Sequence, residues 1–322
     1  PAIPTPPVEH SERGHSSWLR VIKGEQMPVA VQAPVRPASG SRLQTLLDSA
    51  TFVVTAELAP PDSAEPAALQ RRAQTLRKAV DALNVTDAAG AYCHLSSLAA
   101  CVLLRQIGCE PILQLTCRDR NRIALQGDIL GAAALGVGNL LCLTGDGVEH
   151  GDHPGAKPVF ELDAVSLLET ASTLAGGRYL SGRELEAAPQ LFLGAADNPF
   201  APPHAARPAR LAKKVAAGAR FVQTQYCFDV ALFSRYMQAV RDAGLHERCR
   251  VLVGVGPLVS ARAAHWLRHR VPGVHIPDAL IARMERCADQ REEGVRICVE
   301  IVQRVREIPG VAGIHLMAHR HD

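Results

Sequence analysis

The sequence predicts a single (β/α)8 barrel, or TIM barrel, with an N-terminal extension. From residue 51 onward, eight short apolar or β-branched runs alternate with eight stretches of helical period, the pattern of a parallel sheet with right-handed crossovers. Eight such units in about 270 residues fit a closed barrel better than an open doubly wound sheet. An open sheet would also want a glycine-rich turn after its first strand, where this chain has Leu58-Ala59-Pro60-Pro61.

Each element follows from its local pattern. The strands are the short apolar runs, expected at residues 51–57, 80–86, 111–116, 138–144, 190–196, 220–226, 250–256 and 311–317. The helices are the stretches in which apolar residues recur every three to four positions, expected at 65–78, 95–106, 120–135, 163–174, 207–217, 230–243, 261–269 and 290–308. Such a stretch buries one face against a sheet and leaves the other in water.

The N-terminal segment differs from the rest of the chain. Seven prolines fall within the first 37 positions. We expect residues 1–48 to form a partly irregular arm or cap and residues 49–322 to form the barrel. Leu43, Leu46 and Leu47 share one face of a short helical segment, which would let that segment plug the bottom of the barrel.

Composition excludes several classes of protein. Hydrophobic residues make up 47% and charged residues 21%, which is ordinary globular usage. A net charge of +3 without a basic block argues against nucleic-acid binding, and no apolar stretch is long enough to cross a membrane. The first residues carry no export pattern, and the nine cysteines contain no C-x-x-C pair. We therefore expect a soluble cytoplasmic protein with reduced thiols and no bound metal.

Polar residues close seven of the eight expected strands, at the end of a barrel where catalytic groups stand. They are Glu57, Thr86-Asp87, Gln114 and Thr116, Thr144-Gly145-Asp146-Gly147, Asp197-Asn198, Thr224-Gln225, and His315. Glu57 has apolar neighbours, which would raise its pKa and suit a general acid, although pairing with an arginine at the rim is the alternative. Asp146 lies between two glycines, where either a ligand approaches the backbone closely or the aspartate bonds its own turn.

Two charged segments leave alternatives open. The segment Asp146–His153 holds two histidines and three carboxylates, and we interpret it as a mixed polar loop rather than a metal site. The segment Arg118–Arg122, after the third strand, is either a helix-capping charge cluster or a contact for an anionic ligand tail.

A series of motifs from residue 50 to residue 320 carries a family resemblance. They are A-E-L-A-P-P with Glu57, N-V-T with Thr86, Leu115-Thr116-Cys117, L-T-G-D at 143–146, Lys213-Lys214-Val215 with Gly218-Ala219, Thr224-Gln225 with Phe228-Asp229, Gly254 with Pro257, H-I-P at 275–277, and Arg320. In this order and spacing the chain resembles the methylenetetrahydrofolate reductase family, the flavin-dependent (β/α)8 barrels of one-carbon metabolism.

The resemblance implies a reaction and a set of roles. Hydride would pass from NADH or NADPH to a bound flavin, FAD, and then to 5,10-methylenetetrahydrofolate, giving 5-methyltetrahydrofolate. Glu57 would be the general acid, and Asp146 would act beside the flavin and the pterin. The implied substrate contacts are Gln114, Asp146, Gln225 and Arg320. The implied flavin contacts are Thr86, Thr116, Gly145, Asp146, Ala196, Lys213 and Lys214. The loop after Asp146 would be an active-site lid.

The chain departs from the family mainly on the cofactor side. Thr144 stands where the family has an arginine, and Ala196 stands where it has a tyrosine that packs on the flavin. Arg207 and Arg210 replace an acidic and an amide residue near the adenosine, and Ala261 replaces an aromatic residue. Three routes for the hydride are therefore open: a divergent flavoenzyme using FAD or FMN, direct transfer from NADH or NADPH, and flavin or electrons borrowed from a partner. Of these, we expect the flavoenzyme.

Two functions from different classes remain. The first is a methylenetetrahydrofolate reductase, expected to be a homo-oligomer, and it is our preferred interpretation. The second is a folate-binding barrel that hands one-carbon tetrahydrofolate to a methyltransferase or an electron carrier without reductase activity of its own. A lyase using Lys213 or Lys214 for Schiff-base chemistry is disfavoured, because these lysines fall on an outer helix rather than at a strand end.

Overall fold

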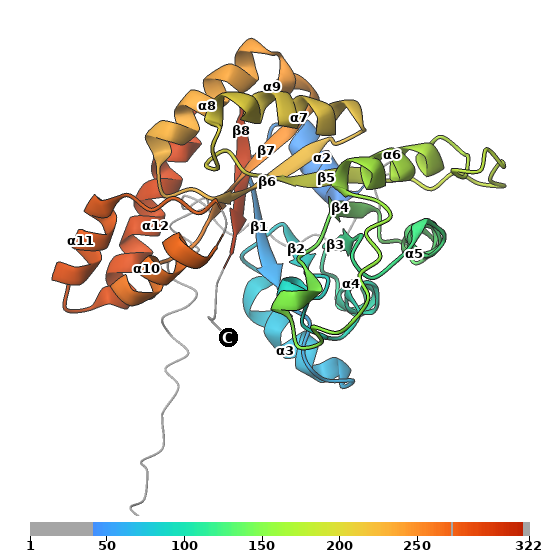
Figure 1. The fold of residues 1–322 in the computed structure, drawn as a ribbon, viewed down its shortest axis with the longest axis horizontal. Coiled ribbons are helices and arrows are strands. Elements are labelled where there is room, and N and C mark those ends of the chain that lie inside the picture. The colour runs from blue at the N-terminus through green and yellow to red at the C-terminus, as the bar shows by residue number, and fades with distance from the viewer. Residues whose placement is uncertain (1–40, 272, 318–322) are drawn as a thin grey trace, which may run out of the picture.

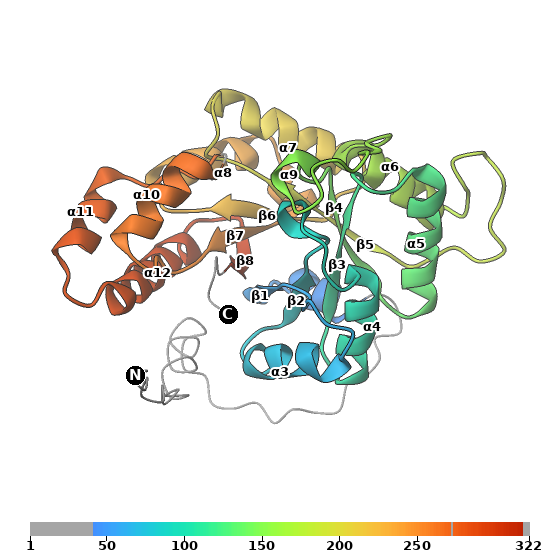
Figure 2. The same ribbon diagram turned by 60° about the horizontal axis from the view of Figure 1, so that its bottom comes forward.

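The computed structural model describes residues 41–271 and 273–317, and these form a closed barrel of parallel strands. Each strand pairs with the next along the chain, and β8 closes the ring against β1. The helices surround the strands, as Figure 1 and Figure 2 show from two directions. The predicted (β/α)8 barrel is confirmed.

The elements lie close to their expected positions. The strands are β1 Val53–Leu58, β2 Ala82–Val85, β3 Pro111–Thr116, β4 Asn139–Leu143, β5 Phe192–Asp197, β6 Phe221–Tyr226, β7 Arg250–Val255 and β8 Val311–Leu316. The helices are α2 Arg42–Asp48, α3 Pro66–Leu76, α4 Ser97–Gln106, α5 Arg122–Ala134, α6 Ala164–Ala175, α7 Arg207–Ala216, α8 Val230–Asp242, α9 Leu245–Arg248, α10 Ala261–Arg270, α11 Asp278–Arg286 and α12 Gln290–Arg306. Single 3-10 turns are η1 Ala89–Ala91, η2 Val148–His150 and η3 His204–Ala206.

Two helices were not expected from the sequence, α11 and the short α9. They occupy stretches that the sequence pattern assigned to connections, and α11 buries only Ile281 and Met284. Figure 1 shows α10, α11 and α12 gathered on one side of the barrel. Within residues 41–271 and 273–317, no helix combines the length and the apolar character that a membrane crossing needs.

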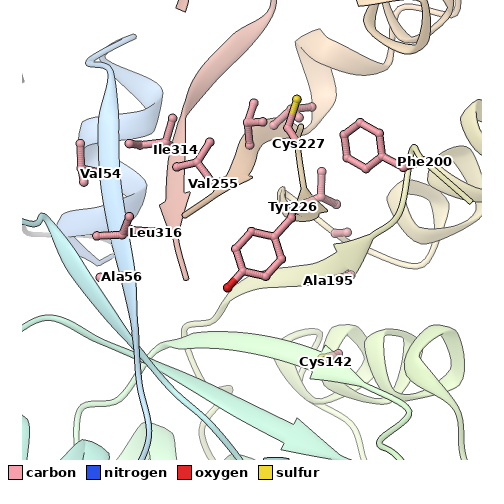
Figure 3. Packing of buried hydrophobic residues seen from close by; sticks show 14 of the residues in the cluster. Val54, Ala56, Cys142, Ala195, Phe200, Tyr226, Cys227, Val255, Ile314 and Leu316 are labelled. Atoms are coloured by element: carbon pink, nitrogen blue, oxygen red, sulfur yellow. The ribbon is translucent and has the colours of Figure 1, made fainter. Parts of the chain in front are cut away.

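The outward faces of the strands form the main core with the helices. Val54 and Ala56 of β1 and Ile314 and Leu316 of β8 belong to one large buried cluster, part of which Figure 3 shows. Successive side chains of a strand point to opposite sides, so the residues between these face the barrel interior. On β1 the interior residues are therefore Val53, Thr55 and Glu57.

Helix α2 closes the end of the barrel where the strands begin. Leu43 and Leu47 are fully buried in a separate apolar cluster with residues near the start of the strands. The strand members of that cluster are Val53, Ala82, Ile112, Leu141, Phe192, Phe221 and Leu252. Leu46 packs against the same cluster, as expected for a plug. The rest of the predicted arm, residues 1–40, lies outside the described residues.

The barrel interior changes from apolar to polar along its axis. Above the plug cluster lie buried polar side chains, namely Thr55, Asn84, Gln114, Gln223 and His315. Burying a polar group costs free energy unless the group is hydrogen-bonded. The side chains of this layer must therefore hydrogen-bond to one another or to a ligand. The polar end is the carboxyl end of the strands, where the candidate site lies.

Candidate active site at the carboxyl end of the barrel

One cavity of about 760 Å³ opens at the carboxyl ends of the strands. It brings together seven of the predicted site residues, namely Glu57, Gln114, Asp146, Ala196, Lys213, Lys214 and Gln225. The remaining lining residues are Leu141, Leu143, Val165, Asp197, Asn198, Arg207, Arg210, Gln223, Thr224, His315 and Met317. Polar groups thus converge on an apolar floor, as in a site for a small organic ligand.

Glu57 provides the acidic group of this cavity. Burial raises the pKa of its carboxyl, and a hydrogen bond with Gln114 opposes that rise only in part. Its side chain keeps 35% of its surface exposed, which leaves the carboxyl accessible to a ligand. Among the residues that the structure describes, no arginine or lysine pairs with Glu57, so the rim ion pair considered from the sequence is not formed. A carboxyl whose pKa is raised in this way keeps its proton to higher pH than a free glutamate does, which suits a proton donor.

His315 lies behind Glu57 and is uncharged. Its ring is buried, and burial lowers its pKa to about 3. Nε2 lies 4.0 Å from Oε2 of Glu57, and Nδ1 lies 2.9 Å from Oγ1 of Thr55. The single proton of the Thr55 hydroxyl goes either to Nδ1 or to the Ile314 carbonyl at 3.3 Å. If the Thr55 hydroxyl donates to Nδ1, the ring proton is on Nε2, which then faces Glu57 as a donor. If the hydroxyl donates to the Ile314 carbonyl, Nδ1 can carry the ring proton, and Nε2 then faces Glu57 as an acceptor.

A pair of buried amides anchors this arrangement from the other side of the barrel. Asn84 Nδ2 donates to Oε1 of Gln223 at 2.6 Å, and Gln223 Nε2 donates to Oδ1 of Asn84 at 2.9 Å. Gln223 Nε2 also donates to the Thr55 hydroxyl at 3.2 Å. Asn84, Thr55 and Gln223 were not predicted as site residues from the sequence. Their signal is a polar residue at an inward position of an otherwise apolar strand.

Asp146 is fixed by the loop after β2 rather than by its own turn. One of its carboxylate oxygens accepts the backbone N–H of Gly90 at 2.9 Å. The preceding residue, Gly145, has φ +99°, and a Cβ there would lie 3.0 Å from Cβ of Thr116. Only glycine therefore fits comfortably before Asp146. The buried Arg118 donates to the carbonyls of Ala88 at 3.2 Å and Asp146 at 3.5 Å, which ties both loops to the end of β3.

Gln225 and Gln114 place amide groups on the cavity wall. Oε1 of Gln225 accepts the backbone N–H of Tyr226 at 2.9 Å, which orients the side chain at the end of β6. Gln114 lies beside Glu57 at the end of β3 and is 7% exposed. Both are positioned to recognise a ligand with several hydrogen-bonding groups.

The two lysines of α7 have different surroundings. Lys214 donates to the carbonyl of Ala196 at 2.6 Å and to Oδ1 of the buried Asp197 at 2.9 Å. The other carboxylate oxygen of Asp197 accepts the Tyr236 hydroxyl at 2.6 Å. Burial, with Asp197 adding to it, raises the pKa of Tyr236, so this hydroxyl remains a donor. Lys213, one position earlier, has no such partner in the described part of the chain.

Four predicted residues are not part of this cavity lining. Thr86 is buried with its hydroxyl unpartnered, whereas Thr116 gives both its N–H and its hydroxyl to Asp87. Gly145 lines a separate shallow hollow beside the end of β4. Arg320 lies outside the described residues.

The charged segment after β3 makes its contacts within the protein. In the segment 118–122, Asn121 caps α5 by accepting N–H groups of Ile123 and Ala124. Arg118 pairs with Asp119, Arg120 with Asp87 and Asp128, and Arg122 with Glu161. This favours the capping cluster over a ligand contact.

The loop that follows Asp146 packs on the loop after β2. Asp152 accepts the backbone N–H of Cys93 at 3.3 Å. Gly151 approaches so closely that a Cβ there would meet the Ala91 carbonyl oxygen at 1.9 Å. A lid role for this loop stays a prediction.

The lining does not supply the contacts that the resemblance assigns to FAD. None of the lining residues named above is Phe, Tyr or Trp, so the cavity wall offers no such ring to stack on an isoalloxazine. Ala196 presents only a methyl group, and Lys214 is committed to Asp197. The buried hydroxyl of Thr86 has no hydrogen-bond partner, as expected of a group that binds a ligand, but Thr86 is not among the residues that line the cavity. The residues present therefore do not fit FAD in the implied arrangement, and FAD use stays a prediction.

Comparison with known proteins identifies the family of this chain. The family model for methylenetetrahydrofolate reductase matches residues 42–322. A Caenorhabditis elegans protein described as a probable methylenetetrahydrofolate reductase (NADPH) is 23% identical over 229 residues, which are 69% of this chain and 32% of that protein. The chain thus spans about a third of the length of this curated relative.

A solved structure shares the fold. It is an uncharacterized protein from Clostridium thermocellum, described as binding two copies of 5-methyl-5,6,7,8-tetrahydrofolic acid. Its TM-score is 0.59 at 14% identity, with 88% of this chain and 94% of that chain covered. This likeness concerns the fold alone. Because the family model matches nearly all of the barrel, the chain belongs to the methylenetetrahydrofolate reductase family.

Proposed function

We propose that this protein reduces 5,10-methylenetetrahydrofolate to 5-methyltetrahydrofolate, with hydride drawn from NADH or NADPH and Glu57 as the general acid. The observation that carries the proposal is the Glu57 carboxyl, which has a raised pKa, is unpaired with any described cation, and lies on the cavity wall next to His315. Membership of the family supports it, and the C. elegans relative is described as an NADPH-dependent reductase of this kind.

The proposed reaction has two steps. Glu57 donates its proton to N10 of the folate. The bond between N10 and the methylene carbon then breaks, and the electron pair of that bond stays on N10. The methylene carbon is then an iminium carbon on N5. Hydride from C4 of the reduced nicotinamide adds to that carbon, which gives the methyl group and leaves NAD⁺ or NADP⁺. Glu57 regains its proton from water, which reaches its carboxyl because 35% of its side-chain surface is exposed, whereas the buried His315, with a pKa of about 3, stays neutral beside it.

The polar residues around Glu57 orient the substrate in this proposal. Gln114 and Gln225 bind the pterin through their amides, and the Asp146 carboxylate accepts hydrogen bonds from its amino side. Asp146 is preorganised for this because Gly90 already fixes one of its oxygens. A group held by the scaffold before the ligand arrives needs no reorganisation during the reaction.

A label-transfer experiment tests the proposal. The protein is mixed with 5,10-methylenetetrahydrofolate and NADH or NADPH deuterated at C4, and the product is examined by mass spectrometry. We expect 5-methyltetrahydrofolate that retains the deuterium in its methyl group, because the cavity shows no stacking ring for an intermediate flavin. A flavin would lose the label to water through its exchangeable N5 hydrogen. A label-free product from a protein with a flavin absorption spectrum would establish FAD or FMN use. No product at all would overturn the reductase.

A folate-binding subunit without reductase activity is the second candidate. Two observations favour it. The C. thermocellum neighbour is described as binding 5-methyl-5,6,7,8-tetrahydrofolic acid. The cavity is lined by Gln114, Asp146 and Gln225, which the resemblance assigns to the folate, but by no Phe, Tyr or Trp that could stack on a flavin. This candidate predicts that the isolated chain binds 5-methyltetrahydrofolate but oxidises neither NADH nor NADPH when methylenetetrahydrofolate is added. A methyltransferase or electron carrier would then be its partner.

A further inference from the structure

One wall of the cavity is made of cations from a single helix. Arg207, Arg210, Lys213 and Lys214 of α7 all line the cavity. Their spacing of three, three and one residues places them along one face of the helix. Arg207 and Lys213 are six residues apart, which is about 9 Å along a helix axis.

Only one of these four cations is neutralised. Lys214 pairs with the buried Asp197. Arg207, Arg210 and Lys213 form no ion pair with any carboxylate of the described residues, Glu57 and Asp146 of the same cavity included. Exposed arginines and lysines often lack a partner, but three in a row on a cavity wall concentrate positive charge where a ligand enters.

Arg207 is also held in place. Its Nε donates to the carbonyl of Ala201 at 2.6 Å, and its Nη2 donates to the carbonyl of Pro202 at 2.8 Å. These acceptors are neutral, so they fix the guanidinium without cancelling its charge. Arg210 and Lys213 are exposed and form no side-chain hydrogen bond with the described part of the chain, so their donors are available to a ligand.

We propose that Arg207, Arg210 and Lys213 form an anion subsite that binds the negatively charged tail of the ligand whose reacting end lies at Glu57. The position of that reacting end rests on the proposed function. The tail must carry at least two oxyanions over a span of about 9 Å, the length of the cationic face. Arginine binds both carboxylate and phosphate oxygens in pairs. Two sources share this chemistry: the γ-linked glutamates of a folate, and the phosphates of the nicotinamide dinucleotide.

The experiment compares the wild-type protein with the double variant Arg210→Gln/Lys213→Gln. Arg235→Gln is the matched control, since Arg235 is an exposed cation of α8 outside the cavity lining. Dissociation constants are measured for 5-methyltetrahydropteroate, 5-methyltetrahydrofolate with three γ-linked glutamates, NADPH, and inorganic tripolyphosphate. Both replaced side chains are exposed, so the variant should keep the wild-type melting temperature, which is checked first.

The subsite predicts a selective loss in the double variant. Each partly screened contact is worth about two- to fivefold in affinity, so binding of the tailed ligand should weaken by about 4- to 25-fold, and less so at high salt. Affinity for 5-methyltetrahydropteroate and all affinities of Arg235→Gln should stay within about twofold of wild type. Loss confined to the triglutamate assigns the subsite to the folate tail, and loss confined to NADPH assigns it to the dinucleotide.

Two other outcomes overturn one proposal each. If the double variant binds the triglutamate, NADPH and tripolyphosphate as tightly as wild type does, the anion subsite is wrong and the proposed function is untouched. If wild type binds neither folate, the proposed function is wrong, and weaker binding of tripolyphosphate or NADPH by the double variant still supports the subsite.

Discussion

Replacing Lys214 with Met should destabilise the protein much more than the same change at Lys213. Lys214 is 17% exposed and donates to Asp197, whose side chain is 2% exposed. Removing the ammonium leaves a buried carboxylate with the Tyr236 hydroxyl at 2.6 Å as its remaining side-chain donor. Removing one partner of a buried ion pair costs about 3–5 kcal/mol. Because water still reaches the Lys214 position, we expect about 2–4 kcal/mol here.

The free energy of unfolding in urea at pH 7 measures this directly. Lys213→Met should fall within about 0.5 kcal/mol of wild type, since Lys213 is exposed and unpaired in the described part of the chain. Asp197→Asn in the Lys214→Met background should recover part of the loss, because it removes the buried charge that was left behind. If both lysine variants unfold at the same urea concentration, the burial argument for Asp197 is refuted.

Three further predictions concern the barrel and the cavity. Because burial lowers the pKa of His315 to about 3 from 6.5, its contribution to stability is complete above pH 6.5 and declines as the pH falls toward 3. Urea unfolding at pH 7 and pH 4 should therefore show a loss about 3 kcal/mol larger for wild type than for His315→Asn, and equal losses would contradict it. Leu43→Ala should cost about 2–5 kcal/mol of unfolding free energy by opening a cavity in the plug cluster, whereas Gln44→Ala, at a half-buried position outside that cluster, should cost much less; similar costs would show that α2 does not plug the barrel. Gly145→Ala should weaken binding of 5-methyltetrahydrofolate by displacing Asp146, since φ +99° strains an alanine by about 1–2 kcal/mol and its Cβ meets Thr116; calorimetric titration showing wild-type affinity would count against that role of Asp146.

The fold could be predicted from the sequence because its signal is local and repeated. Each strand is an apolar run, each helix has its own periodicity, and the eight units leave few ways to close a sheet. Helix α11 was missed since it buries only Ile281 and Met284, too little to give a clear pattern. Glu57 could be predicted for a similar reason, as its apolar neighbours lie next to it in the chain.

Contacts across the barrel could not be predicted, because they join residues far apart in the chain. Asn84 and Gln223 are 139 positions apart, and each looks like an isolated polar residue within its strand. Lys214 bonds Asp197 and Lys213 does not, because successive residues of α7 point in different directions and only Lys214 is on the side that faces Asp197. The resemblance therefore assigned both lysines to the cofactor, whereas the structure gives Lys214 a carboxylate partner within the barrel.

The most direct test of the central claim compares wild type with Glu57→Gln in forming 5-methyltetrahydrofolate from 5,10-methylenetetrahydrofolate and NADH or NADPH. The acid must be protonated to act, so the wild-type rate should fall as the pH rises through the raised pKa of Glu57. The variant should bind 5-methyltetrahydrofolate as wild type does but form product at least about 100-fold more slowly at every pH. Product formation by Glu57→Gln at the wild-type rate, with the same pH dependence, would contradict the role of Glu57 as the general acid.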